Sequence, residues 1–433
     1  MTDVPFLPPA ALGLGASHVS AEESIALADV LSADLDDRLV EADRALTAGF
    51  PGDTPDRQPV HTVYVSADLF TADLVPSWGA AALEAIDTEA DLFAEVVGDD
   101  DVVERVRAKL ATEPIEDLRL DFEDGYGNRG DEAEDADALA AAAALARGLA
   151  DRTVSPYCGI RFKSLEAPTR HRGVRTLTIF LSRLIEADRR LQDFVLVLPK
   201  ITSVDQVEAM TELTGRLEES FGLDPDTLRF ELQIETPQSI LGPDGTALVA
   251  RMIHAGRGRI TALHYGTYDY SAFCGIPAAY QSMDHPVADH AKLVMQAAAA
   301  GTGVRLSDGS TNILPIGDTE AVRRGWELHS RLVRRSLERG YYQGWDLHPA
   351  QLPTRYAATY AFFRESFDAA ARRLRNYVEQ TGGSVMDEPA TARALSDYIV
   401  RGVDCGAISP AEVATATGLG LGALTALARP HRA

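Results

Sequence analysis

Eight short runs rich in β-branched and aromatic residues follow one another along the chain. They occupy residues 60–66, 118–123, 158–163, 194–200, 229–235, 261–266, 303–308 and 344–348. Most of the connections between them are long enough to hold a helix, as parallel crossover connections require. Eight such units predict an α/β fold, a (β/α)8 TIM barrel that spans residues 60–365.

Two segments flank the predicted barrel. We expect residues 1–59 to form a mostly helical N-terminal extension and residues 366–433 to form a C-terminal helical segment. Within the second, Ser409, Pro410 and Glu412 match the start of a capped helix, with the serine as cap and the glutamate closing a capping box.

Composition excludes several classes of partner. The chain has 41 basic and 65 acidic residues, a net charge of -24 that repels nucleic acid and anionic membranes. No apolar run approaches the roughly 20 residues of a membrane helix. The first twenty residues do not resemble a secretory signal, and the three cysteines are scattered. We therefore expect a soluble, cytoplasmic protein with no nucleic-acid or membrane partner.

Alternation within the strands predicts which side chains line the barrel. Four sets share one face of their strand: Arg119, Asp121 and Glu123; Glu231, Gln233 and Glu235; Arg161 and Lys163; Asp346 and His348. An antiparallel sheet with one wet side would also show this pattern, but the helix-length connections argue against it. In a barrel we expect these faces to point inward, where charges must be paired, hydrated or bound to a ligand.

Two carboxylates lie at the carboxyl ends of neighbouring predicted strands. Glu235 ends the fifth strand and Asp269 lies just past the sixth. Two carboxylates with open coordination positions suit Mg2+, and Mn2+ would also fit. The pattern alone favours a metal site and a pair of structural carboxylates about equally.

A fixed positive charge is predicted beside them. Arg161 ends the third strand and could bind a substrate carboxylate or a developing enolate. Asp121, Glu123 and Asp124 would add negative charge nearby, by binding metal-bound waters or by orienting Arg161.

Seven motifs in order resemble a known family. They are "LDFEDGY", "GIRF", "VLPKI", "LQIETP", "HYGTYDYSAFCGI", "VRLSDGS" and "GWDLHPAQL". Over roughly residues 60–360 the chain resembles the citrate lyase β-subunit-like branch of the HpcH/HpaI aldolase superfamily, which includes malyl-CoA lyases. The aromatic loop around Tyr268 and the two long extensions mark it as a divergent branch.

The resemblance implies a TIM barrel in which Glu235 and Asp269 bind Mg2+. It also implies a homo-oligomer, a trimer or a hexamer. We predict catalytic roles for Arg161, Lys200, Glu123 and His348, and substrate contacts for Arg161, Asp121, Gly266 and Tyr268. A CoA thioester is a possible substrate, but the departures from the family leave CoA use open.

Three of these residues have competing interpretations. Lys200 could form a Schiff base, but the resemblance favours a charge partner in the acidic mouth. His348 could be an acid or base, or could hold the last strand by hydrogen bonds, which we favour slightly. His264 faces inward by alternation and is a weaker candidate for proton transfer.

These features together predict a Mg2+-dependent carbon-carbon lyase or aldolase that acts on a small 2-oxo or hydroxy acid through a metal-stabilised enolate. One alternative is an enzyme that handles phosphoenolpyruvate or pyruvate enolate on the same barrel. Another is a non-catalytic sensor or partner subunit that binds a metal and an acid.

Overall fold

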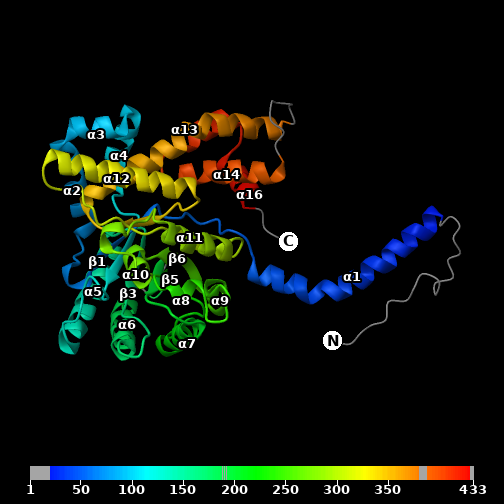
Figure 1. Cartoon of the computed structure of the whole chain (residues 1–433), viewed down its shortest axis with the longest axis horizontal. Helices are drawn as coiled ribbons and strands as arrows, with labels where there is room; N and C mark the ends of the chain where they lie inside the picture. Colours follow the sequence, from blue (N-terminus) through cyan, green and yellow to red (C-terminus); the bar gives the residue numbers. More distant parts are fainter. Residues whose placement is uncertain (1–19, 188, 190, 192, 380–387, 430–433) are drawn as a thin grey trace. The chain divides into compact units, whose positions relative to one another are not determined.

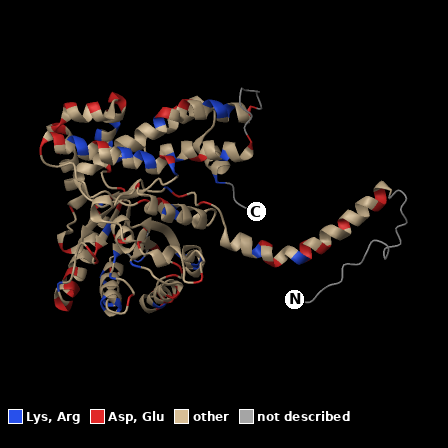
Figure 2. Ribbon diagram, in the orientation of Figure 1, with Lys and Arg blue, Asp and Glu red and all other residues tan. Residues whose placement is uncertain are grey.

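The computed structural model of the protein describes residues 20–187, 189, 191, 193–379 and 388–429 (Figure 1). The chain divides into two compact units, Met1–Pro51 and Gly52–Ala433. The described part of the first unit is one helix, α1 (Ala21–Gly49), which begins at a capping box formed by Ser20 and Glu23. No residue of α1 is buried, and acidic residues recur along the helix (Figure 2).

The second unit contains the eight predicted strands in one parallel sheet. They are β1 (His61–Ser66), β2 (Asp117–Asp121), β3 (Tyr157–Arg161), β4 (Phe194–Leu198), β5 (Arg229–Ile234), β6 (Ile260–Tyr265), β7 (Arg305–Ser307) and β8 (Gly344–Asp346). Their order is β7-β6-β5-β4-β3-β2-β1-β8, and each neighbour is parallel to the next. A parallel bridge between Ser307 and Gln343 joins the two outer strands, so the barrel is nearly closed. The TIM-barrel prediction is confirmed.

Helices fill the connections between the strands. They are α2 (Leu74–Thr88), α3 (Ala90–Val97), α4 (Asp100–Thr112), α5 (Asp131–Asp151), α6 (Arg170–Ile185), α7 (Val204–Phe221), α8 (Pro237–Ile240), α9 (Leu248–Ala255), α10 (Thr267–Phe273), α11 (Pro286–Ala299) and α12 (Thr319–Glu338). Short 3-10 turns lie at η2 (Ala67–Leu69), η3 (Ala278–Tyr280) and η4 (Pro349–Gln351).

Four helices follow the last strand: α13 (Leu352–Val378), α14 (Pro389–Asp404), α15 (Pro410–Thr417) and α16 (Leu421–Ala428). The predicted boundary at residue 365 falls inside α13. This helix packs on α12 and α4 of the barrel and also on α14 and α15. The predicted capping box is present, since the Ser409 hydroxyl accepts the N–H of Glu412 and the Glu412 carboxylate accepts the N–H of Ser409.

Alternation places the two faces of β2 and β5 as predicted. Leu118, Leu120, Phe230 and Leu232 are fully buried in the hydrophobic core. The opposite face of these strands points into the barrel, where Arg119 of β2 donates to Glu231 of β5 at 2.8 Å. The interior of the barrel is therefore polar, and its charges pair across the axis.

One predicted face is wrong. Asp346 of β8 contacts Arg355 of α13 at 2.9 Å and His329 of α12 at 3.0 Å, so its side chain lies on the helix side of the sheet. His61 of β1 contacts the same carboxylate at 2.7 Å. Trp345 takes the inward position instead. The error arises because β8 has polar or amphipathic groups on both faces, and alternation alone cannot set its phase.

No single helix in the described part of the chain is long and apolar enough to cross a membrane. The bent pair α15 and α16 reaches the required length and composition only when the two helices are taken together.

Candidate functional site

The charged residues singled out in the sequence lie at one mouth of the barrel. They are Asp121 at the end of β2, Glu123 just past it, Arg161 at the end of β3, Lys200 after β4, Glu235 after β5, and Asp269 in α10 after β6. All eight strands are parallel, so their carboxyl ends share this mouth, which is where barrel enzymes carry their active sites.

Arg161 is held by a bidentate ion pair. Its Nε donates to Asp121 Oδ1 at 2.7 Å and its Nη2 donates to Asp121 Oδ2 at 2.6 Å. Nη1 donates to Gln233 at 3.2 Å and lies 3.6 Å from Glu123. The arginine is 5% exposed. Asp121 therefore orients Arg161, which is one of its predicted roles. The binding of metal-bound waters by Asp121 and its direct contact with substrate stay predictions.

Two aromatic rings flank the guanidinium. Its carbon lies 4.7 Å from the ring centre of Tyr64 and 5.9 Å from that of Trp345. The Trp345 indole donates to His264 Nδ1 at 3.1 Å, and His264 Nε2 lies 3.1 Å from Glu231. His264 is thus fully buried beneath Trp345, which argues against a role in proton transfer at the mouth.

The sequence pattern does not identify Tyr64 or Trp345 as parts of this site. It places Gln233 on the inward face without a role. The aromatic residues carried no signal except their phase: Tyr64 lies two residues after Thr62, whose hydroxyl donates to the inward-facing Asp117.

Glu235 is 1% exposed and its two oxygens are both engaged. One accepts the N–H of Lys200 at 2.7 Å, and the other accepts the amide of Gln233. Burial raises the pKa of Glu235 well above its usual value; the charges of Asp269 and Glu123 add to the increase and Arg161 opposes it. Gly266 makes room for this packing, because a Cβ there would lie 2.5 Å from that of Glu235.

Lys200 bridges the other carboxylates of the mouth. Its Nζ donates to Glu123 and to Asp124, each at 2.7 Å, and lies 3.8 Å from Asp269. Burial disfavours the ammonium, but hydrogen bonds to Asp124 and Glu123 outweigh it and raise the pKa of Lys200. A lysine held as an ammonium is not a nucleophile, which argues against the Schiff base. Its backbone is left-handed (φ 52°), an uncommon conformation for a lysine.

The pKa values of Glu123 and Asp124 shift in opposite directions in this cluster. Burial raises the pKa of Glu123, with Asp124 adding to the effect and Arg161 opposing it. Burial also disfavours the charged form of Asp124, but its hydrogen bond from Lys200 lowers the pKa overall. The more buried Glu123 is therefore the one that more readily holds a proton, as a proton-transferring group requires.

The predicted loop after β6 forms the start of α10. Gly266 is its N-terminal cap, and its N–H donates to Ile234 at 3.0 Å. Asp269 lies in the first turn with its side chain 39% exposed. The Tyr268 hydroxyl accepts the N–H of Asn312 at 2.6 Å, so Tyr268 ties this helix to the loop after β7. Contacts of Gly266 and Tyr268 with substrate stay predictions.

His348 caps the short turn η4. Its Nδ1 accepts the N–H of Ala350 at 3.1 Å, and burial lowers its pKa. This supports the structural interpretation. Lys163 is also engaged structurally: it donates to Glu134 of α5 at 2.6 Å and to the Phe122 carbonyl at 2.7 Å.

The residues present fit a divalent cation. Negative charge converges on Glu235, which is buried and would be stabilised by a cation. Across the described ranges, no group of three or more His, Cys, Asp or Glu side chains is arranged to hold a metal. Mg2+ commonly takes one or two carboxylates and completes its shell with water and substrate. The donor set of Glu235 and Asp269 fits that preference.

Fold and mouth together define a (β/α)8 barrel with an acidic, arginine-containing cluster at the carboxyl ends of its strands. The chain belongs to the family described as domain of unknown function DUF6986, whose model matches residues 39–432. No curated protein matches the sequence.

Solved structures share the fold. A citrate lyase from Burkholderia xenovorans has 19% identity and a TM-score of 0.55, with 86% of this chain and 100% of its own covered. A malate synthase from Haloferax volcanii has 14% identity and a TM-score of 0.48, with 86% and 99% covered. The CitE protein of Mycobacterium tuberculosis, solved with magnesium, acetoacetate and coenzyme A, has 17% identity and a TM-score of 0.46, with 82% and 100% covered.

The first of these structures confirms the sequence resemblance at the level of the barrel. At such low identity, the likeness establishes the fold and not the reaction.

Proposed function

We propose that the protein is a Mg2+-dependent carbon-carbon lyase or aldolase that acts on a small 2-oxo or hydroxy acid. The observation that supports this most is Glu235, a buried carboxylate beside Asp269 and Glu123 at the catalytic end of the barrel. Such a group is costly to ionise unless a cation compensates it. The barrel shared with a citrate lyase makes carbon-carbon chemistry the reaction class to test first.

A bound Mg2+, held by Glu235 and Asp269, would act as a Lewis acid toward a substrate carbonyl or carboxylate oxygen. Arg161 would bind the substrate carboxylate through Nη1, while Asp121 and the two aromatic rings hold its guanidinium in place. Lys200 would fix Glu123 and Asp124 at the rim. In the cleaving direction the hydroxyl loses its proton to a base, the carbon-carbon bond breaks, and its electrons pass into the enolate.

Three further properties belong to this proposal. The substrate could be free or a CoA thioester, which parallel assays with both forms would decide. The assembly would be a trimer or hexamer, with a mass in light scattering of about three or six times that of one chain. A reducing compartment such as the cytoplasm suits the three cysteines, which are all free.

Calorimetric titration with Mg2+ and oxalate, a mimic of pyruvate enolate, tests the site. We expect oxalate to bind only with Mg2+, and Glu235→Gln to abolish that binding. Asp244→Asn is the matched control, because it removes one carboxylate charge from an exposed position in the loop between α8 and α9. Oxalate binding that is equal in wild type and Glu235→Gln would contradict the metal site.

Retro-aldol release then tests the reaction. Candidate hydroxy acids, their CoA thioesters and phosphoenolpyruvate are assayed for release of pyruvate, glyoxylate or acetyl-CoA, with and without EDTA. We expect Arg161→Lys to lower kcat/KM by about 10²- to 10³-fold, because lysine cannot make the bidentate contact with Asp121. Oxalate binding without turnover of any candidate would favour the sensor instead, and turnover confined to phosphoenolpyruvate would favour the alternative enzyme.

A further inference from the structure

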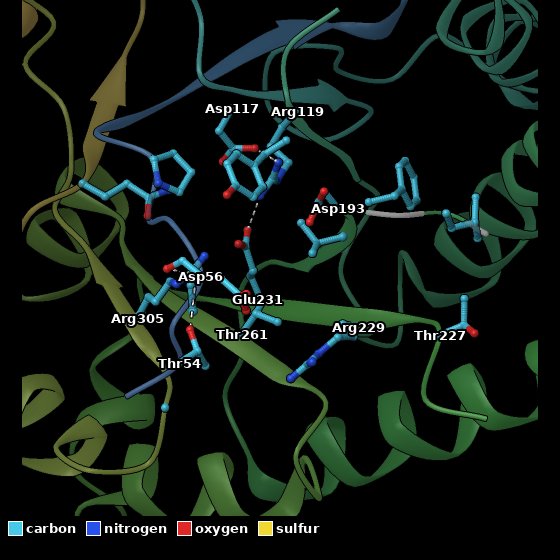
Figure 3. Close-up of a pocket in the computed structure, with 18 residues that line it drawn as sticks. Thr54, Asp56, Asp117, Arg119, Asp193, Thr227, Arg229, Glu231, Thr261 and Arg305 are labelled. Atoms are coloured by element: carbon cyan, nitrogen blue, oxygen red, sulfur yellow. Dashed lines mark hydrogen bonds and ion pairs between the residues drawn. The ribbon is translucent and has the colours of Figure 1, made fainter. Parts of the chain in front are cut away.

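A cavity of about 310 Å3 opens at the opposite end of the barrel from the candidate active site. Figure 3 draws its lining residues as sticks. It is lined by residues that begin strands, among them Tyr157, Phe194, Arg229 and Arg305. A strand the length of β5 spans about 20 Å, which separates this cavity from Glu235. The volume is at the lower end of the range for small-molecule sites, about 300 to 1,000 Å3.

Arg305 lines this cavity without a carboxylate partner. Its Nη2 donates to the Thr54 hydroxyl at 3.3 Å and to the backbone carbonyl of Asp56 at 2.9 Å (Figure 3). Among the residues that the structure describes, no Asp or Glu forms an ion pair with it. Arg119, Arg161, Arg259 and Arg355 each contact a carboxylate at 2.9 Å or less. Arg305, which is half-buried, differs from these four buried arginines in having no carboxylate partner among the described residues.

The surroundings of Arg305 disfavour its bare charge. Burial lowers its pKa, and the neighbouring charge of Arg401 acts in the same direction, although Tyr157, Asp56 and Glu231 oppose them. An anionic group beside the guanidinium would remove this penalty. Arg305 therefore offers an unpaired guanidinium beside a cavity, as expected of a binding position for an oxyanion.

The inner wall of the cavity cannot supply that anion. Asp117 and Glu231 both lie there, but each contacts Arg119, and Glu231 also contacts His264. This internal pairing forms a polar floor across the barrel. It also separates the cavity from the candidate active site above it.

The remaining lining limits the ligand. Thr54, Thr227 and Thr261 line the cavity, and Phe194 and Ala262 add apolar surface. Asp56 and Asp193 also line it, so a second negative charge on the ligand would be repelled. The lining suits a compact molecule with one carboxylate and a hydrogen-bond donor.

We propose that this cavity binds a small monocarboxylate whose carboxylate pairs with Arg305 and whose hydroxyl or ammonium group donates to the acidic side of the cavity. This second site is independent of the proposed lyase activity.

Ligand-observed NMR titration of the full-length protein tests the proposal, with glycine, glycolate and inorganic phosphate as probes at constant ionic strength. Glycine carries an ammonium group and glycolate a hydroxyl, so they distinguish the two donors. We expect at least one to bind with a Kd in roughly the millimolar range, and phosphate to bind more weakly. Failure of both carboxylates to bind, or tighter binding of phosphate, would overturn the proposal.

Variants assign the bound probe to its site. Arg305→Gln is expected to weaken binding by about tenfold or more, whereas Glu235→Gln leaves it unchanged. Loss of binding in Glu235→Gln would place the probe in the upper mouth and refute a second site. Unchanged binding in folded Arg305→Gln would also refute the proposed second site.

A further variant separates ligand binding from folding. Thr261→Leu narrows the cavity but keeps the Arg305 guanidinium, and should weaken binding by about tenfold. If circular dichroism shows that Arg305→Gln is unfolded, Thr261→Leu decides, and unchanged affinity in that variant would count against the site.

Discussion

Glu235 combines deep burial with neighbouring negative charge. Its pKa is raised above the usual value of 4.5, first by burial and then by Asp269 and Glu123. The folded state therefore keeps a proton that the unfolded state has already lost above pH 4.5. Since the folded state binds more protons in that range, the free energy of unfolding of the metal-free protein must fall as pH rises.

Glu235→Gln should remove this dependence. In EDTA the variant should gain about 1 kcal/mol or more over wild type between pH 4.5 and 7, because each unit of pKa shift is worth about 1.4 kcal/mol. Urea unfolding at several pH values measures the difference. Saturating Mg2+ should reduce it, since the cation compensates the buried charge. Parallel pH profiles for the two proteins in EDTA would contradict this account of Glu235.

Substitutions of His348 can distinguish a role in proton transfer from a role in capping the turn η4. His348→Asn should keep kcat/KM within about threefold, because an asparagine oxygen can accept the same capping N–H. If His348 transfers a proton, the same substitution should instead lower kcat/KM by about 10²- to 10⁴-fold. His348→Ala is the companion variant, expected to destabilise the protein by about 1 kcal/mol through loss of the cap. Activity measured at equal folded fraction separates the two roles.

Single residues also show what the sequence could and could not predict. Arg161 and Glu235 were placed at the mouth because each ends a strand with a clear alternation. Tyr64 and Trp345 were missed because an aromatic residue on a strand suits the outer, helix-covered face equally well. The left-handed backbone of Lys200 has no signal in its residue type, since it arises where the loop after β4 meets the Glu235 carboxylate.

At the level of elements, the sequence predicts the positions of the strands better than it predicts which face of β8 points inward. All eight were found, because each short β-rich run is bounded by helical connections. β8 is only three residues long, and both of its faces meet polar groups, so its phase depends on tertiary contacts. The same limit applies to the boundary placed at residue 365, since nothing in the local pattern there interrupts α13.

β3 carries a strict packing constraint at Gly159. A Cβ there would lie 2.1 Å from the Val195 carbonyl and 3.1 Å from the Cδ of Arg119. Gly159→Ala should destabilise the protein by about 1 to 3 kcal/mol, because the strand backbone and the paired arginine must both shift. Gly215→Ala in α7 meets nothing within 4 Å and should be neutral or stabilise by about 0.5 to 1 kcal/mol. Equal urea midpoints for the two variants would contradict the constraint.

At the scale of the whole molecule, one buried network ties β8 to β1 and to the helices before and after β8. Asp346 joins His61 of β1, His329 of α12 and Arg355 of α13. Burial lowers the pKa of His329 below 6.5, although Asp346 opposes this. The unfolded state thus binds a proton more readily than the folded state below pH 6.5, so the stability contributed by the neutral histidine is lost as pH falls.

His329→Gln should flatten that part of the stability profile. Between pH 6.5 and 5 the wild type should lose up to about 1.4 kcal/mol per unit of pH more than the variant. Thermal unfolding across this range provides the measurement, and His254→Gln in α9 is the control for removal of a histidine outside the network. A variant profile as steep as that of wild type would show that another group governs acid unfolding.

The continuity of α13 affects how the gene can be divided. A stop codon after residue 365 would leave the first half of the helix attached to the barrel but remove Ala370, Ala371 and Leu374, which are buried. It would also uncover Phe363 and Tyr360, whose partners lie in the part removed. Fragments for expression, fusions and domain exchange should therefore be joined in the 50–52 region, not between the barrel and the C-terminal helices.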